Sequence, residues 1–495
     1  MRIAKLTLLV CAAAAAQTPI DWQAALNRVS ADSLKGHLSF LASDLLEGRD
    51  TPSQGLDIAA EYIAAQFRRA GLEPAGNEGY FHTSTWYVVE QGSDGFQLEL
   101  ESGARKISVP VSQAVLNVSR AIDIAAAPVF KVELGGAEPA GTDVAGKVVV
   151  LVVPSQPNLM RPFFAFRSAM QKLKPACVIL ADPDGYLTGT VGRKRPYATE
   201  PASIPSPAGF EMVSVRNTEV ARMLASSEPA TARLRVPEPR LATVKLRNVL
   251  GLLRGSDPAL RETYVMVNAH YDHIGTLAPG PGDRVYNGAN DDGSGTVSVL
   301  EVAAALGALP VRPKRSILFG TFFGEEKGIL GARQFARNPP FPIGRIAAAL
   351  TLEQTGRTDS TEGPQINSAN LTGFDFSDLS RRLVEAGKQA GVRVWKHEAS
   401  SDAFFSRSDN IALAEAGVPS HTLSVAYNYP DYHGLGDHWD KIDYDNMARV
   451  VRAVALGLLL TADDPVAPEW NAENPRTERY RKAAEAIRAP RKSTE

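Results

Sequence analysis

Between Val244 and Gln354 the apolar residues form short, nearly continuous runs that alternate with helical patterns. The runs YVMVNAH, RSILFGTFF and IAAALTLEQ have the length and composition of buried strands. The stretches GTVSVLEVAAALGAL and ILGARQFARN separate them and carry apolar residues at helical spacing. This β-α-β-α-β order predicts an α/β fold in which helices cover both faces of a sheet.

The rest of the chain suggests a second, smaller unit. Two helices are predicted between residues 32 and 71, and Ser30 can cap the first of them. Near Ala121 the composition changes: VAGKVVVLVVP and ACVILADP read as buried strands, and proline-rich loops surround them. We therefore expect the main domain to combine residues 17–120 and 241–464, with a separate unit at 121–240 and a polar tail at 465–495.

The first residues have the pattern of a secretory signal peptide. Arg2 and Lys5 precede a short apolar stretch, and an alanine run offers cleavage sites near Ala16. The apolar stretch is much shorter than the roughly 20 residues that span a bilayer. Lipid attachment at Cys11 is an alternative, but the residues before it are not small. We expect residues 1–16 to be removed and the protein to be periplasmic or extracellular.

Composition narrows the choice of partners. The chain has 495 residues, of which 53 are basic and 55 acidic, for a net charge of −2. This balance gives no reason to expect nucleic acid or an anionic membrane as a partner. No other apolar run is long enough to span a membrane. Outside the signal peptide Cys177 stands alone, so it is expected to be a buried core residue without a disulfide.

Candidate chemistry lies where the predicted strands end. VNAHYDHIG places His270 and Asp272 on the same side of an extended chain, where the carboxylate can orient the imidazole toward a metal. GANDDGSG places Asp291 before a helix. Each motif also has an ordinary explanation, because a core histidine paired with an aspartate and a capping aspartate are both common.

Three further strand ends supply carboxylates and a histidine. FFGEEKGILG sets Glu325 and Glu326 side by side, and TLEQTGR places Glu353 near the end of a buried strand. YPDYHGLGDHWDKID supplies His433, with His438 as a competitor. Ligands of sheet-based sites converge at the carboxyl ends of strands. In most proteins an adjacent glutamate pair is a solvated surface feature. Here the other candidate ligands at neighbouring positions of the predicted fold suggest a role in metal binding.

Together these motifs form a set of metal ligands. Mixed histidine and carboxylate ligands suit zinc or a related divalent metal. Five ligands are too many for one catalytic zinc with an open position, but they suffice for two zinc ions that share a carboxylate. Glu325 is then left without a metal to bind. The predicted ligands are His270, Asp291, Glu326, Glu353 and His433.

The motifs NAHYDHIG, GANDDGSGT, FFGEEKGILG, LEQTGR and YHGLGDHWDKID, in this order, resemble those of a known family. It is the family of two-zinc aminopeptidases that share a fold with glutamate carboxypeptidases and the transferrin receptor. The resemblance implies the zinc exopeptidase fold, a mixed, mostly parallel sheet sandwiched by helices. DVAGKVVVLVVP and QKLKPACVILADPDG are similar to the protease-associated domain inserted in many relatives.

The resemblance also implies roles for single residues. His270, Asp291 and Glu353 would hold one Zn²⁺, and Asp291, Glu326 and His433 the other. Asp272 would orient His270, Glu325 would be the general base, and Tyr432 would help to stabilise an oxyanion. Glu353 stands where many relatives have aspartate, and the Asp291–Asp292 peptide is often cis in this family.

The implied activity is exopeptidase cleavage, most simply removal of N-terminal residues from peptides with a free amine. A glutaminyl cyclase-like reaction on one zinc and a glutamate carboxypeptidase-like reaction are alternatives on the same fold. A non-catalytic binding protein is a third, although such a protein would be expected to lose ligands or the base, and every position here holds a competent residue.

Overall fold

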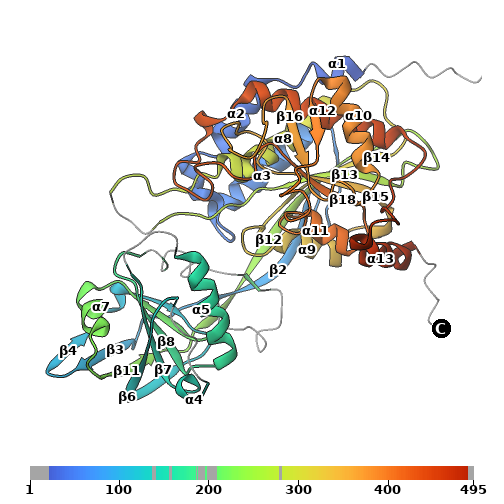
Figure 1. Cartoon of the computed structure of the whole chain (residues 1–495). Coiled ribbons are helices and arrows are strands. Elements are labelled where there is room, and N and C mark those ends of the chain that lie inside the picture. Colours follow the sequence, from blue (N-terminus) through green and yellow to red (C-terminus); the bar gives the residue numbers. More distant parts are fainter. Residues whose placement is uncertain are drawn as a thin grey trace, which may run out of the picture.

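The computed structural model describes residues 22–135, 141–154, 159–185, 187, 196–197, 209–277 and 281–488. The expected signal peptide at 1–16 lies outside the described residues. None of the described helices combines the length and the apolarity needed to cross a bilayer. The chain forms a larger and a smaller unit, which are joined by a long two-stranded ribbon (Figure 1).

A mixed sheet forms the centre of the larger unit. Four strands at its middle pair in parallel, and they are β13 (Tyr264–His270), β14 (Ser316–Phe322), β15 (Ile346–Leu352) and β18 (Ser420–Ser424). Strands β16 (Ser368–Leu371) and β17 (Arg393–Trp395) extend one edge, and β12 (Arg240–Leu253), β2 (Phe81–Glu90), β9 (Pro196–Tyr197) and β1 (Glu73–Pro74) extend the other. The expected α/β architecture with a mixed sheet is confirmed.

Parallel pairing is less widespread than expected. In the sheet of the larger unit it is confined to the four central strands and to β16 with β17, whereas β12 runs antiparallel to both β14 and β2, and β16 runs antiparallel to β18. The description "mostly parallel" is therefore too strong for the described strands. The ribbon accounts for one of these pairs, because a chain that leaves the sheet through β2 and returns through the neighbouring β12 must pair antiparallel.

Both faces of this sheet are buried under helices. Along β13, Tyr264 and Met266 contribute to one hydrophobic core, and Val265 and Val267 contribute to the other. The first face carries α9 (Leu330–Arg337), α11 (Asn410–Glu415) and α13 (Glu478–Arg488). The opposite face carries α1 (Trp22–Leu26), α2 (Ala31–Leu41), α3 (Gln54–Arg69), α8 (Gly295–Gly307), α10 (Leu379–Ala390) and α12 (Tyr444–Asp463). Strands buried on both faces explain why the sequence shows continuous apolar runs there.

Two local expectations can be compared directly with the structure. Ser30 caps α2, since its hydroxyl accepts a hydrogen bond from the Ser33 N–H at 3.1 Å. The segment after residue 464, expected as a polar tail, packs on the larger unit as far as residue 488. Trp470 and Tyr480 stack there with ring centroids 4.9 Å apart, and both are buried. The segment is mostly polar in sequence, so the few apolar residues that anchor it, such as Trp470 and Tyr480, were not recognised as core residues.

The smaller unit is built on an eight-stranded curled sheet. Its strands are β3 (Gln97–Ser102), β4 (Arg105–Ser108), β5 (Ala114–Asn117), β6 (Ile122–Val132), β7 (Val148–Val152), β8 (Cys177–Ala181), β10 (Met212–Val215) and β11 (Ala230–Val236). It also contains the helices α4 (Gly141–Val144), α5 (Met160–Leu173) and α7 (Thr218–Ala225). Cys177 is buried in β8 with a free thiol, as expected. Strands β3, β4 and β5 precede residue 121, so the sheet begins earlier in the chain than the composition change suggests.

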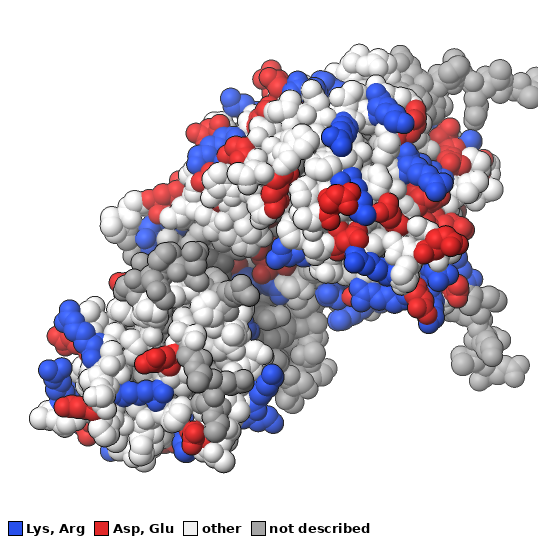
Figure 2. Space-filling model, viewed as in Figure 1, with Lys and Arg blue, Asp and Glu red and all other residues white. Residues whose placement is uncertain are grey.

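The ribbon and the surface complete the description. Strands β2 and β12 remain paired from Phe81 with Val249 to Glu90 with Arg240, and they carry the chain between the two units. On the face shown in Figure 2, basic and acidic side chains are interspersed over the larger unit. This distribution agrees with the nearly balanced net charge of −2.

The buried His421 leads to a prediction about stability. Burial lowers its pKa from 6.5 to about 4, and its ring bonds to Ser377 Oγ (2.6 Å) and Thr372 O (2.8 Å). Above pH 6.5 the imidazole is neutral in both states. As the pH falls toward 4 the unfolded chain takes up the proton first, so stability is lost, by up to ~3 kcal/mol.

We therefore expect the free energy of unfolding of the wild type to fall relative to that of His421→Gln between pH 7 and pH 4. Urea denaturation of both proteins at several pH values measures this difference. A difference that stays constant over this range would show that His421 does not titrate on unfolding.

Candidate metal centre

The candidate residues converge at one edge of the central sheet. His270 is the last residue of β13, and the Glu325–Glu326 pair follows β14, its parallel neighbour. Glu353 follows β15, which pairs with β13 on the other side. Because parallel strands end at the same edge, these side chains are brought together although they lie far apart in the sequence.

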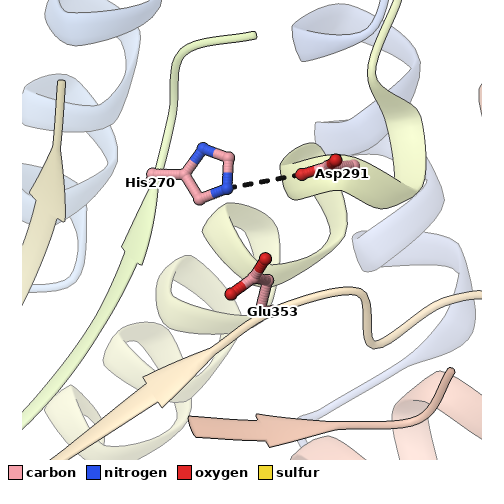
Figure 3. A group of neighbouring side chains, drawn as sticks. All are labelled: His270, Asp291 and Glu353. Carbon is pink, nitrogen blue, oxygen red and sulfur yellow. Dashed lines mark ion pairs between the residues drawn. The ribbon is translucent and has the colours of Figure 1, made fainter. Parts of the chain in front are cut away.

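The first cluster consists of His270, Asp291 and Glu353. One ligand atom of each lies within 4.8 Å of those of the others. Figure 3 shows the imidazole at the end of β13 facing Asp291 from the turn before α8, with Glu353 entering from the end of β15. His270 Nε2 lies 3.4 Å from Asp291 Oδ1, and its Nδ1 lies 3.5 Å from Asp272 Oδ1. The same nitrogen lies 3.2 Å from the backbone carbonyl oxygen of Asp272, so both groups of Asp272 lie next to the imidazole.

The second cluster lies on the other side of Asp291. His433 Nε2 lies 3.0 Å from Asp291 Oδ2 and 3.2 Å from Glu326 Oε1. The two oxygens of Asp291 therefore face different histidines, Oδ1 toward His270 and Oδ2 toward His433. Asp291 thus stands between the two clusters and offers one oxygen to each. The competitor His438 pairs instead with Asp283, at 3.2 Å.

Several buried groups hold Asp291 in place. The backbone N–H groups of Asn290 and Asp291 both donate to the carboxylate of Asp437, at 3.0–3.1 Å, and the Tyr429 hydroxyl donates to the same group. The carboxylate of Asp292 turns away and accepts hydrogen bonds from Gly295 N and Gln354 N. The Asp291–Asp292 peptide is cis, as the family resemblance suggested.

Arg49 is a supporting residue that the sequence did not reveal. Its side chain is 1% exposed and donates to the backbone carbonyls of Leu41, Tyr271, Asn287 and Gly288. Burial lowers the pKa of this guanidinium to about 10, although nearby aspartates, above all Asp272, oppose the effect. Arg49 thereby joins the loop after β13 to the loop that carries Asp291. Its sequence context, LEGRD, predicted only a loop.

His273 is the second residue that sequence reasoning passed over. It lies in the same motif as His270, and one of its ring nitrogens lies within 4.8 Å of ligand atoms of Asp291 and Glu326. Its side chain is completely buried. The signal was available, because NAHYDHIG contains two histidines. Only the first matched the ligand positions that the resemblance implied.

The electrostatics of the site favour cations. Burial and neighbouring carboxylates raise the pKa of Glu325 well above its usual range and that of Glu353 to about 7. Burial also raises the pKa of Asp409, behind them, to about 8. Burial and Asp291 would raise that of Glu326 as well, but His433 and His273 bring it to about 2. Burying so many carboxylates close together costs free energy, because their negative charges repel and lose contact with water. A bound cation would offset this repulsion.

The polar atoms of the site fit a metal. Among the described residues, His270 Nε2 and Glu326 Oε1 are buried without a hydrogen-bond partner. The nearest polar atoms are Asp291 Oδ1, 3.4 Å from His270 Nε2, and His273 Nδ1, 2.9 Å from Glu326 Oε1. Buried polar atoms without hydrogen-bond partners in two neighbouring clusters are typical of ligands around metal ions. The donors, nitrogen and oxygen, are those preferred by zinc.

Glu325 and Tyr432 lie beside the ligands. The backbone N–H of Glu325 donates to Asp272 Oδ1 at 3.0 Å, which couples the base candidate to the residue that faces His270. Tyr432 is 45% exposed, and its ring stacks on His433 with centroids 4.1 Å apart. Both side chains therefore border the site without belonging to either cluster of ligands.

Comparison with known proteins identifies relatives of this site. Residues 248–457 match peptidase family M28. Over 475 residues the chain is 23% identical to a probable lipoprotein aminopeptidase of Mycobacterium tuberculosis, which covers 88% of this chain and 86% of that protein. It is 32% identical over 246 residues to a probable zinc metalloprotease of Pyrenophora teres f. teres, covering 46% of this chain and 50% of that protein.

Solved structures show the same fold. A zinc aminopeptidase from Bacillus subtilis superposes with a TM-score of 0.57 at 17% identity, covering 90% of this chain and 97% of that one. Because 90% of the chain is more than the larger unit alone, the similarity includes the smaller unit. The family match contains every predicted ligand from His270 to His433. The chain is therefore a metallopeptidase, and residues 248–457, which contain the candidate site, are similar to peptidase family M28.

Proposed function

We propose that this chain is an exported two-zinc aminopeptidase that removes N-terminal residues from peptides. The observation that carries the proposal is the position of Asp291, whose two oxygens face His270 and His433 at 3.4 and 3.0 Å. One position would be held by His270, Asp291 and Glu353, and the other by Asp291, Glu326 and His433. The relatives named as aminopeptidases support this choice of reaction.

The proposed mechanism assigns one task to each neighbouring side chain. Zn²⁺ held by the two clusters would supply Lewis-acid chemistry, namely a lowered pKa of the attacking water and polarisation of the scissile carbonyl. Glu325 accepts the proton of the attacking water and passes it to the leaving amine. Asp272 holds the imidazole of His270 with Nε2 toward the ligand cluster. The hydroxyl of Tyr432 donates a hydrogen bond to the oxyanion.

Two further features belong to the proposal. The smaller unit would be a protease-associated domain that flanks the substrate cleft, as the similarity of its strand motifs suggests. The N-terminal residues would direct export, with cleavage near Ala16. The Mycobacterium tuberculosis relative is described as a probable lipoprotein, which supports an exported location.

The base assignment leads to the first test. Glu325→Gln is nearly isosteric and cannot accept the proton, so we expect kcat to fall by about 10²–10⁴-fold. Both zinc ions should remain bound, since Glu325 is not among the proposed ligands. Measurement of kcat and of zinc content on the same preparation separates the two effects. Glu385→Gln, on the exposed surface of α10, is the matched control and should keep wild-type activity.

Near wild-type turnover in Glu325→Gln would refute the base assignment. Loss of one metal together with activity would place Glu325 among the ligands instead.

The class of substrate leads to a second test. An aminopeptidase requires the free amine, so amino-acid amides should be hydrolysed and their N-acetylated analogues should not. Zinc quantified in the same samples should approach two ions per chain, and removal by a chelator should abolish activity until zinc is restored.

Other outcomes point to the alternatives. Cyclisation of N-terminal glutamine with one zinc per chain would favour the glutaminyl cyclase-like reaction. Release of C-terminal glutamate from N-blocked peptides would favour the carboxypeptidase-like one. Bound metal without cleavage of either amide series would indicate a binding protein.

A further inference from the structure

We propose that His273 is a fourth ligand at the position formed by Asp291, Glu326 and His433, bound through its Nδ1 atom. The proposal rests on the two-metal site described above and adds a residue to it. That position would then have two histidines and two carboxylates, whereas the position at His270 has one histidine and two carboxylates.

The surroundings of His273 fix its ring. Its backbone N–H donates to Arg49 O at 3.2 Å, which ties the loop after β13 to the Arg49 segment. One side of the ring lies against Gly288, where the backbone has φ of 57° and a Cβ atom would collide with the imidazole. The side chain is completely buried. Because the ring is confined in this way, the surrounding residues determine the directions in which its two nitrogens point.

The distances place Nδ1 among the ligand atoms. It lies 2.9 Å from Glu326 Oε1, the same oxygen that lies 3.2 Å from His433 Nε2. The rings of His273 and His433 meet edge to face, with centroids 5.6 Å apart and an interplanar angle of 76°. Ligands bound to one tetrahedral zinc at about 2.0–2.2 Å have their donor atoms about 3.3–3.6 Å apart. The separations from His433 Nε2 (3.0 and 3.2 Å) are close to this range, and that from His273 Nδ1 to Glu326 (2.9 Å) is somewhat shorter.

A hydrogen bond from His273 to Glu326 is the competing explanation. Although the two atoms are close, neither Nδ1 nor Nε2 of His273 has a hydrogen-bond partner among the described residues, and Glu326 Oε1 has none either. His270 Nε2, which faces the other cluster, shows the same combination of a near acceptor and no hydrogen bond. A buried imidazole with both nitrogens unpaired is costly unless one of them binds an ion.

The extra ligand makes the two positions unequal. Three protein ligands leave a catalytic zinc an open place for water or substrate, whereas four fill a tetrahedral shell. We therefore expect the position with His273 to bind zinc more tightly and to fill first, while the position with Glu353 keeps the open coordination place.

The test compares metal affinities of metal-free wild type, His273→Gln and His82→Gln, measured by competition with a chromophoric zinc chelator. Glutamine keeps a hydrogen-bond donor for Glu326 but is a poor zinc ligand. We expect His273→Gln to bind the tighter zinc more than about 100-fold more weakly, beyond the roughly 10–100-fold loss typical of a partner that only orients a ligand. His82 is a buried histidine outside the site, bonded to Asn338 O, and its variant should retain both affinities.

Retention of both affinities within about 10-fold by His273→Gln would overturn the proposal and leave the two-metal function standing. A wild type that binds fewer than two zinc ions would overturn both. If His273→Gln does not fold, His273→Cys and His273→Ser provide a pair of nearly equal size. The thiolate should bind zinc at least about 10-fold more tightly than the hydroxyl variant, and equal affinities would refute the ligand role.

Discussion

The structure of the site depends on the carboxylate of Asp291. Its two oxygens face two histidines, His270 and His433, that lie far apart in the sequence, and each oxygen belongs to a different cluster. A carboxylate can do this only if its backbone is fixed, and Asp437 fixes it through the N–H groups of Asn290 and Asp291. The turn before α8 is therefore a part of the site rather than a connection between elements.

The other supporting groups can be understood from the same requirement. Arg49 is buried without a directly bonded carboxylate, which is unusual for a charged side chain. Its charge lies near four aspartates of the site, and its hydrogen bonds all go to backbone carbonyls. It thus supplies positive potential without competing with a metal for ligand oxygens, because none of the carboxylates is used to bind it.

The sequence predicted the strands and helices that position the site, since continuous apolar runs mark strands buried on both faces. It also predicted that His270, Glu326 and Glu353 lie near the ends of strands or in the loops after them. It did not predict Arg49, Asp437 or the packing of Tyr480, because each acts through contacts between segments far apart in the chain. Local periodicity contains no information about such contacts. The antiparallel pairing of β12 was missed for the same reason, since it follows from where the second unit leaves and rejoins the sheet.

The ribbon of β2 and β12 has a consequence for how the smaller unit is joined to the larger one. Glu90 and Arg240, where the chain leaves and re-enters, are direct partners in the ladder. Strands that end opposite each other can be joined by a two-residue turn. Apart from β9, which pairs with β2 at the edge of the larger sheet, the intervening residues thus occupy the place of a hairpin loop. A smaller unit joined at such a point leaves the register of β2 with β12 unchanged, and a change in its size does not require the residues around Asp291 to move.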